Sequence, residues 1–176
     1  MFDESGAGKA FSRAWALSGA RVDLEPLRTG HAEEMADVLG DPALHRFIGG
    51  VPDDMEQLRA RYARMTAGSS DPAVHWLNWV IRLREEHHLV GTVQATVEGG
   101  TAEIAWVVGT PWQGRGIAVE AARALVAGLA AYGVRRVVAH IHPDHTASAA
   151  VARAAGLAPT DEWQDGEVRW RAELAG

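Results

Sequence analysis

The fold of this chain is decided by the stretch Val107-Val108-Gly109-Thr110-Pro111-Trp112-Gln113-Gly114-Arg115-Gly116-Ile117-Ala118. Ahead of it, two sets of residues alternate at the two-residue period of a strand. They are Ala102, Ile104, Trp106 and Val108 on one side and Thr101, Glu103, Ala105 and Val107 on the other. Behind it, apolar residues recur every three or four positions, the period of a helix. The stretch is therefore predicted to join a strand to the first turn of a helix that runs to about Gly133.

The turn within this stretch has the features of a phosphate-binding site. Gly114 and Gly116 carry no side chain where the backbone turns, so a ligand can approach the peptide N–H groups closely. The N–H groups at a helix start are unpaired donors at the positive end of the helix dipole. The loop lacks the Gly-Lys-Ser/Thr ending of nucleoside-triphosphate loops and the Gly-x-Gly-x-x-Gly fingerprint of dinucleotide-binding folds. Another phosphate-bearing ligand is therefore expected.

The residues Gln113-Gly114-Arg115-Gly116-Ile117-Ala118 fit the pattern Gln/Arg-x-x-Gly-x-Gly/Ala. With this pattern placed between a strand and a helix, and Trp112 just ahead of it, the chain resembles the GNAT family of N-acetyltransferases. In that family a loop of this form holds the pyrophosphate of acetyl-coenzyme A (acetyl-CoA). The resemblance implies that acetyl-CoA is the cosubstrate and that these six residues help to bind it. For Arg115 the alternative is an arginine that only faces solvent.

Composition narrows the partners of the chain. Its 176 residues suit one domain with a core of its own. A net charge of −6 without a basic tract argues against nucleic acid, and it suits a cationic substrate such as an amine. The absence of cysteine excludes disulfides, thiolate metal sites and a cysteine acyl-enzyme. Because there is neither a secretory signal nor a membrane-length apolar segment, we expect a cytoplasmic protein without a membrane partner. A homodimer stays open.

The order of the predicted elements indicates a mixed α/β fold. Residues 1–20 are predicted to be an N-terminal extension, disordered or held only by Phe11, Trp15 and Leu17, and residues 21–176 the domain. A strand over 21–28 precedes a helix over 31–39 capped by Thr29, and a helix from Asp53 or Asp54 to about Ala67. After an antiparallel meander (75–84, 89–97, 101–108) and the central helix come a strand over 137–141, a helix over 148–155 and a strand over 168–174.

The strand–helix–strand passage between 101 and 141 implies one parallel pair in an otherwise antiparallel sheet, flanked by helices. This is the GNAT order, and the resemblance covers about residues 21–174. It is closest to the Rim-type ribosomal-protein N-terminal acetyltransferases, in which segments like Ala102-Glu103-Ile104-Ala105-Trp106 and Pro143-Asp144-x-x-x-Ser148 are typical. The family places the coenzyme arm between two splayed strands. Here these would end at Val108 and Ile141, with backbone amides around Val107 and Val108 binding the arm and polarising the carbonyl.

Glu103 is the candidate general base. It shares a strand side with Ala105 and Val107, an apolar row in which loss of water would raise the basicity of a carboxylate. The alternative is a structural glutamate that pairs with an arginine or contacts solvent. Glu120, in the first turn of the central helix, is expected to complement the helix dipole rather than to catalyse.

His145 and Ser148 stand where the family usually has Asn-x-x-Ser or Asn-x-x-Ala. The resemblance implies that His145 replaces the asparagine that binds the coenzyme arm, although an imidazole cannot match an amide donor for donor. Ser148 is expected either to contact the coenzyme thiolate or simply to cap the following helix. The tyrosine that donates a proton to the thiolate in many members is Ala152 here. That role is therefore vacant, or is filled by Ser148 or water.

Two further groups of residues have alternative interpretations. His140, His142 and His145 have a spacing that a zinc site could use, but the family interpretation needs no metal and no fourth ligand is evident, so no metal is expected. Trp76, Trp79 and Trp106 are expected in the core, with one of them lining the amine site.

The sequence as a whole predicts an N-acetyltransferase that moves the acetyl group of acetyl-CoA directly to a primary amine. The acceptor is either a protein N-terminus or a small molecule, and the sequence does not choose between them. One alternative is a non-catalytic acyl-CoA-binding module. A nucleotide-binding regulatory domain is another, which the missing Lys-Ser/Thr disfavours.

Overall fold

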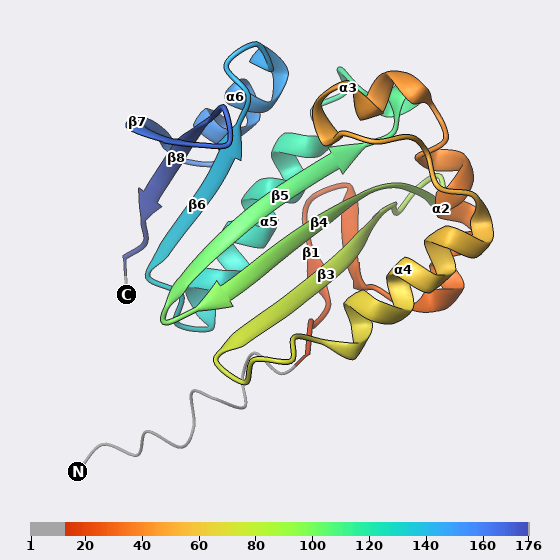
Figure 1. The fold of residues 1–176 in the computed structure, drawn as a ribbon, viewed down its shortest axis with the longest axis horizontal. Helices are drawn as coiled ribbons and strands as arrows, with labels where there is room; N and C mark the ends of the chain where they lie inside the picture. The colour runs from red at the N-terminus through yellow and green to blue at the C-terminus, as the bar shows by residue number, and fades with distance from the viewer. Residues whose placement is uncertain (1–12, 176) are drawn as a thin grey trace.

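The computed structural model describes residues 13–175, which form one domain built on a single sheet (Figure 1). Within this range the strands are β1 (Leu17–Ser18), β2 (Val22–Pro26), β3 (Val74–Leu83), β4 (His88–Glu98), β5 (Thr101–Val108), β6 (Arg136–Ile141), β7 (Ala158–Gln164) and β8 (Glu167–Glu173). They lie in the order β1-β2-β3-β4-β5-β6-β8-β7. Among the neighbouring strands of the described residues, only β5 and β6 pair in parallel, and the other pairs are antiparallel. The predicted mixed α/β fold is confirmed.

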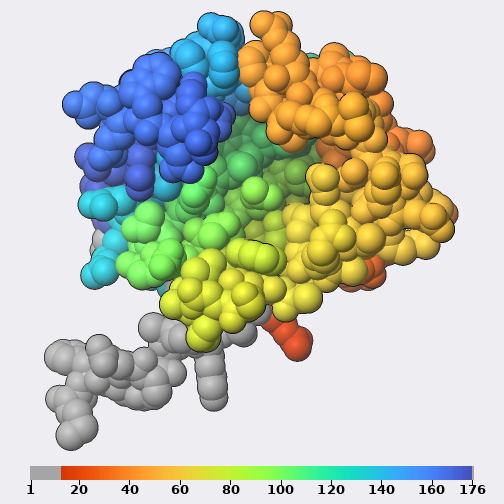
Figure 2. Space-filling model, in the orientation of Figure 1, coloured from red at the N-terminus to blue at the C-terminus, as the bar shows by residue number. Residues whose placement is uncertain are grey.

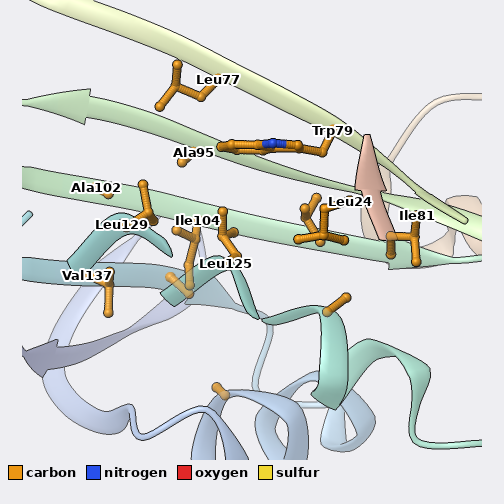
Figure 3. Packing of buried hydrophobic residues seen from close by; sticks show 14 of the residues in the cluster. Leu24, Leu77, Trp79, Ile81, Ala95, Ala102, Ile104, Leu125, Leu129 and Val137 are labelled. Atoms are coloured by element: carbon orange, nitrogen blue, oxygen red, sulfur yellow. The ribbon is translucent and has the colours of Figure 1, made fainter. Parts of the chain in front are cut away.

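Helices cover both faces of the sheet. The α-helices are α2 (Ala32–Val38), α3 (His45–Ile48), α4 (Met55–Ala67), α5 (Ile117–Ala131) and α6 (Thr146–Ala154), with 3-10 turns η1 (Thr29–His31), η2 (Pro42–Leu44) and η3 (Thr110–Trp112). On one face, Leu125 and Leu129 of α5 pack into the main core with Trp79 and Ile104 (Figure 3). On the other face, α2 and α4 share a smaller apolar cluster with β3 and β4.

The helix starts follow their capping chemistry, with one correction. Asp54 caps α4 as predicted: its Oδ1 accepts from Gln57 N at 2.8 Å, and Gln57 Oε1 accepts from Asp54 N at 2.9 Å. The prediction that Thr29 caps the first helix is wrong. Thr29 begins the η1 turn, and α2 starts only at Ala32 without a side-chain cap.

The strands β5 and β6 separate soon after they begin. Three register pairs join them, from Thr101–Arg136 to Glu103–Val138, whereas β4 and β5 stay paired over the full length of β5. Beyond Glu103 the two strands diverge, which opens the sheet on the β6 side of residues 104–108 (Figure 1). The separation predicted for the strands ending at Val108 and Ile141 is therefore present.

The sequence analysis missed two strands, β1 and β7. In β7 all residues but Thr160 are exposed, so no apolar alternation marks this edge strand. The two-residue β1 lies inside the predicted extension: Leu17 packs on the main core, and Trp79 Nε1 donates to the Trp15 carbonyl at 2.6 Å. Phe11 lies outside the described residues. None of the described helices is long and apolar enough to cross a membrane.

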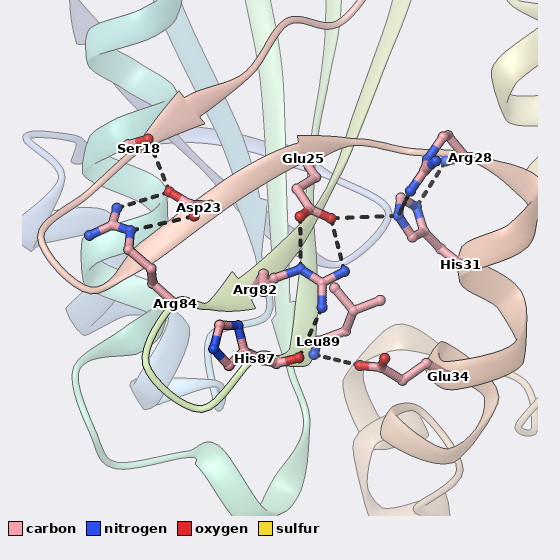
Figure 4. Close-up of polar contacts among 10 residues, drawn as sticks. All are labelled: Ser18, Asp23, Glu25, Arg28, His31, Glu34, Arg82, Arg84, His87 and Leu89. Carbon is pink, nitrogen blue, oxygen red and sulfur yellow. Dashed lines mark hydrogen bonds and ion pairs between the residues drawn. The ribbon is translucent and has the colours of Figure 1, made fainter.

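A polar cluster joins β2 and β3 to the helical layer (Figure 4). Arg82 donates from Nε and Nη2 to the two carboxylate oxygens of Glu25, at 2.7 and 3.1 Å. Beside them, the buried ring of His31 accepts from Arg28 N through Nδ1 at 3.0 Å. Glu34 of α2 accepts from Leu89 N at 2.6 Å, which fixes α2 to the start of β4.

Candidate active site

The loop before α5 has the backbone shape that its glycines predict. Gly114 and Gly116 adopt φ values of 75° and 76°, a left-handed conformation that favours glycine, and Gly116 is the N-cap of α5. Gln113 does not point its amide outward: Nε2 donates to the Val108 carbonyl at 3.0 Å and so fixes the loop to the end of β5. The first N–H groups of a 15-residue helix therefore lie at a rigid turn.

Arg115 is held on the surface beside this loop. Its Nη2 lies 2.8 Å from Glu86 Oε1, and both side chains are about half exposed, so a phosphate can displace the glutamate at little cost. Arg115 does not line the cavity that its neighbours line, and its role toward phosphate stays a prediction.

Glu120 lies in the first turn of α5, as expected for a residue that complements the helix dipole, and it also contacts the start of β2. It accepts hydrogen bonds from the backbone N–H groups of Arg21 and Val22, and Arg21 Nε donates to it at 2.9 Å. Burial would raise the pKa of Glu120, but these hydrogen bonds outweigh it and hold the pKa below its ordinary value. Glu120 therefore anchors the start of β2 to the phosphate helix as a carboxylate.

Two cavities meet beneath the separated strands. The first, of about 310 Å³, lies at the start of α5 and is lined by Gln113, Gly114, Gly116, Ile117, Ala118 and Val108 among others. The second, of about 350 Å³, lies on the α4 side and is lined by residues of α4, β4, β5 and β6. Both are lined by Phe47, Ile48, Trp106, Val107, His145 and Ser148. Figure 2 shows the molecule hollowed over β4 and β5, between the α3–α4 region and the C-terminal strands. Two reactants, one in each cavity, would meet at these shared residues.

His145 and Ser148 form a defined unit at this meeting point. His145, not Ser148, is the N-cap of α6, so the interpretation of Ser148 as the cap is wrong. Nδ1 of His145 accepts from Ser148 N at 3.4 Å, and Nε2 lies 3.0 Å from Ser148 Oγ. Burial first, then the charges of His142 and Arg46, lowers the pKa of His145 and favours the neutral ring.

This arrangement leaves the Ser148 proton available. With Nδ1 accepting, the neutral His145 ring carries its proton on Nε2 and donates it to Ser148 Oγ. The Ser148 hydroxyl is then free to donate its own proton into the cavities that it lines. Phe47 stacks on His145 at 4.1 Å between ring centroids and holds the imidazole in place. Ala152, at the position of the family tyrosine, is fully buried.

Glu103 lies in surroundings other than those predicted. Its side chain is 53% exposed, and it lines neither cavity, so the expected loss of water around it is wrong. The reason is its position at the last pair before β5 and β6 diverge, where the opened sheet admits solvent. Its Oε1 lies 3.0 Å from Nδ1 of His140 on β6, whereas the sequence analysis considered an arginine partner.

Two buried polar atoms on the acceptor side have no hydrogen-bond partner within residues 13–175. They are Tyr62 Oη and His140 Nε2, and both residues line the second cavity. Tyr62 is 2% exposed, and burial raises its pKa to about 12. Unpaired buried polar groups are rare, and a catalytic role or a bound ligand or water is among their explanations. Arg169 Nε, on β8, is a third such atom in the described chain. The sequence analysis assigned no site role to Tyr62, because its spacing in the helix reads as core, or to Phe47, which lies in a stretch without a recognisable motif.

The three histidines of the zinc alternative are engaged separately. His140 contacts Glu103, His145 contacts Ser148, and His142 accepts from Asp144 N at 3.1 Å. In the described part of the chain no group of three or more His, Cys, Asp or Glu is arranged to hold a metal ion. Of the three tryptophans expected in the core, Trp79 is fully buried and Trp106 lines both cavities. For Trp76 the expectation is wrong, because its side chain is exposed.

Comparison with known proteins establishes the family. The family model "Acetyltransferase (GNAT) domain" matches residues 21–158, so the chain belongs to the GNAT family and is an acetyltransferase. No curated protein matches the sequence.

Solved structures show the same fold at low sequence identity. A GNAT acetyltransferase from Bacillus anthracis is 20% identical with a TM-score of 0.75, covering 90% of this chain and 98% of its own. RimL, a ribosomal L7/L12 α-N-protein acetyltransferase in complex with coenzyme A, is 18% identical with a TM-score of 0.75, covering 91% and 98%. The microcin C7 self-immunity acetyltransferase MccE, in complex with acetyl-CoA and AMP, is 17% identical with a TM-score of 0.72, covering 88% and 93%.

Proposed function

We propose that this protein is a cytoplasmic N-acetyltransferase that moves the acetyl group of acetyl-CoA directly to a primary amine within a ternary complex. The observation that carries the proposal is the pair of cavities that share Trp106, Val107, His145 and Ser148. One cavity adjoins the start of α5, whose N–H groups could bind an anion, and the other is lined by residues of α4. Direct transfer needs such an arrangement, because donor and acceptor must reach one point together.

The first cavity supports the assignment of the coenzyme. The pyrophosphate would bind the N–H groups around Gly114 and Gly116, with Arg115 released from Glu86 to contact a phosphate. The arm would follow β5, whose residues beyond Glu103 lack a partner strand on the β6 side. Backbone N–H groups at Val107 and Val108 would then polarise the thioester carbonyl.

The shared residues support the chemistry of transfer. The amine nitrogen attacks the acetyl carbon, a C–N bond forms, and the C–S bond breaks to release coenzyme A as a thiolate. The Ser148 hydroxyl, with its proton free, donates to the departing sulfur. The proton that the amine loses is accepted on the other side, at the pair formed by Glu103 and His140. No metal enters this scheme.

The test is release of free thiol from acetyl-CoA. The protein is incubated with acetyl-CoA and, in separate reactions, with peptides that begin with serine, alanine or methionine, and with spermidine, tyramine and a lysine methyl ester. We expect thiol release above the rate without acceptor for at least one amine, and an acetylated product of the correct mass. Tight acetyl-CoA binding without turnover of any amine would support the acyl-CoA-binding module instead.

A matched pair of glycine variants tests the coenzyme site. Gly116 and Gly133 both have a left-handed backbone, and they flank α5 at opposite ends. Gly116→Val and Gly133→Val therefore bear similar backbone strain, roughly 1–2 kcal/mol. We expect calorimetric titration to show loss of coenzyme A binding for Gly116→Val alone. Unchanged affinity in a folded Gly116→Val protein would contradict the assignment of the loop.

A further inference from the structure

We propose that His140, through Nε2, takes the proton from the acceptor amine, and that Glu103 is the positioning residue that orients its ring. This inference rests on the proposed function and assigns the proton acceptor within it. An alkylammonium has a reference pKa of about 10, so the acceptor must lose a proton before it attacks. Glu103 and His140 are the candidates that the structure brings together at the start of the separated strands.

The hydrogen bond between them fixes where the His140 proton lies. Glu103 Oε1 is 3.0 Å from His140 Nδ1, and a carboxylate can only accept. Nδ1 therefore carries the proton, and in the neutral ring Nε2 presents a lone pair. A carboxylate that orients an imidazole through Nδ1–H also stabilises the imidazolium formed when Nε2 takes a proton. The pair thus has the parts of a base and its orienting group.

Position separates the two candidates. His140 lines the second cavity together with Val107 and Ser148, whereas Glu103 does not line it. The His140 side chain is only 8% exposed, against 53% for Glu103. An amine in this cavity meets the His140 ring, whereas Glu103 does not line the cavity. Because Nε2 itself is buried, a small rotation of the ring must expose this atom before it takes the proton.

The unpaired Nε2 atom points to function rather than to fold. It is buried and has no hydrogen-bond partner among residues 13–175. A histidine that served only to join β6 to β5 would need the Nδ1 contact alone, and its second nitrogen would normally be paired or solvated. The charged and titratable groups around it are Arg169, opposite it on β8, and six residues that line the same cavity: His45, Arg61, Tyr62, His142, His145 and Glu167. None of these makes a hydrogen bond to Nε2.

The step balances without any further reagent. His140 Nε2 first takes the ammonium proton and releases it to water, which leaves the free amine. As the amine nitrogen attacks, the N–H proton passes to Nε2, and the ring becomes an imidazolium paired with the Glu103 carboxylate. The electron pair of the broken C–S bond leaves with sulfur, which takes the Ser148 proton. The imidazolium proton then returns to the Ser148 oxygen through water, so both side chains are restored.

The first experiment measures the His140 tautomer and needs no acceptor. Long-range 1H–15N NMR of the full chain should show His140 as the Nδ1–H form, and Glu103→Gln should shift it toward the Nε2–H form. His142, in the same cavity but not paired with Glu103, is the internal control and should not change. An Nε2–H tautomer in the unaltered protein would overturn the inference.

The second experiment is a double-mutant cycle on thiol release, with whichever of the named peptides and amines is acetylated. His140→Gln should lower turnover about a hundredfold with coenzyme A affinity unchanged, and higher pH should restore part of the rate as free amine becomes available. As a single substitution, Glu103→Gln should lower turnover. Added to His140→Gln, it should have little further effect, because Glu103 acts through the imidazole of His140. The control His87→Gln makes the same chemical change at an exposed histidine that lines neither cavity, and it should retain turnover.

The outcomes distinguish this inference from the proposed function. An equal effect of Glu103→Gln with and without His140 would show that Glu103 acts independently and would overturn the inference. Full turnover by a folded His140→Gln protein would do the same, while leaving the acetyltransferase assignment intact. If the unaltered protein acetylates none of the amines, the proposed function fails first, and the assignment of the base fails with it.

Discussion

Two histidines of this protein each lie beside a glutamate, and the two pairs differ in what they leave unsatisfied. In the cluster of Figure 4, His31 Nδ1 accepts from Arg28 N at 3.0 Å, and Nε2 lies 3.6 Å from Glu25 Oε2. Glu25 is itself held by two hydrogen bonds from Arg82. At the separated strands, His140 uses Nδ1 on Glu103 and leaves Nε2 without a partner in the described chain.

The comparison suggests a criterion for separating structural from functional histidines. Around His31, both nitrogens and the neighbouring carboxylate are engaged by the protein, so the cluster completes the fold by itself. In His140, by contrast, Nε2 has no hydrogen-bond partner in the described chain, and the residue lines a cavity. Mutations should therefore act on stability in the first pair and on turnover in the second.

The largest effect expected on stability is that of His31→Ala. Removing a buried ring leaves a cavity and an unpaired Arg28 N–H, so unfolding free energy should fall by about 3 kcal/mol. Turnover per folded molecule should stay unchanged. His31→Gln, whose amide oxygen can replace the acceptor, should recover part of the loss in urea unfolding. His140→Ala should cost less, about 2 kcal/mol, because its ring is similarly buried but already lines a cavity and makes one hydrogen bond. A reversed ranking would break the comparison.

Glu25→Gln should destabilise the protein by about 1 kcal/mol, because it weakens an Arg82 pair that is partly exposed. The hydrogen bond from Arg82 is the main cause that holds the pKa of Glu25 below its ordinary value of 4.5, against the opposing effect of burial. This contribution is present above pH 4.5 and is lost as pH falls through the lowered pKa. Unfolding curves of the variant and the unaltered protein should therefore converge in acid. Asp23→Asn, at the more exposed Arg84 pair, is the control with a smaller expected effect.

Tyr62→Phe tests the criterion on a residue of another type. The hydroxyl is buried without a partner in the described chain, so its removal should raise stability by roughly 0.5 kcal/mol. If the hydroxyl instead binds the acceptor, the KM for the amine should rise while coenzyme A affinity stays constant. A loss of stability together with an unchanged KM would show that Tyr62 belongs with His31.

The pH dependence of stability should show the smallest effect. Burial first, then the charge of Arg28, lowers the pKa of His31 from 6.5. Below pH 6.5 the unfolded chain takes up the proton before the folded protein does, so stability falls as pH decreases. His145, with its pKa also lowered, acts in the same direction. Between about pH 7.5 and 5.5, Tm should fall less steeply for His31→Gln than for the unaltered protein. Parallel slopes would contradict this.

The sequence predicted most of the fold, because most elements have one buried side. The alternation of Leu77, Trp79, Ile81 and Leu83 placed β3 correctly, and all four are buried. Exposed β7 carries no such signal, since its neighbours in space and not its own residues hold it. Gly91 was also passed over. A Cβ there would lie 2.1 Å from the Val107 carbonyl oxygen, and a glycine inside a strand is the signal for such a close approach.

The site was predicted less completely, because its parts come from strands that diverge. The loop from Gln113 to Ala118 could be read locally, since glycines and a helix start lie together in the sequence. The partner of Glu103 could not be predicted in this way. The register between β5 and β6 places His140 beside Glu103, and a local stretch of sequence does not show that register. The residues of the acceptor cavity come from α3, α4 and β4 as well, and only packing brings them together.

The contact between β1 and α5 has an evolutionary consequence. A Cβ on Gly128, inside α5, would lie 2.6 and 2.7 Å from the two methyl carbons of Leu17. A glycine within a helix is less stable than alanine by about 1 kcal/mol, so this glycine has a reason to persist only while Leu17 lies against it. A descendant that lost the segment before residue 21, where the match to the family model begins, would be free to gain alanine at 128 and the stability that comes with it. A descendant that kept Leu17 would have to move its methyl groups to admit alanine, so changes at the two positions should be correlated across the lineage.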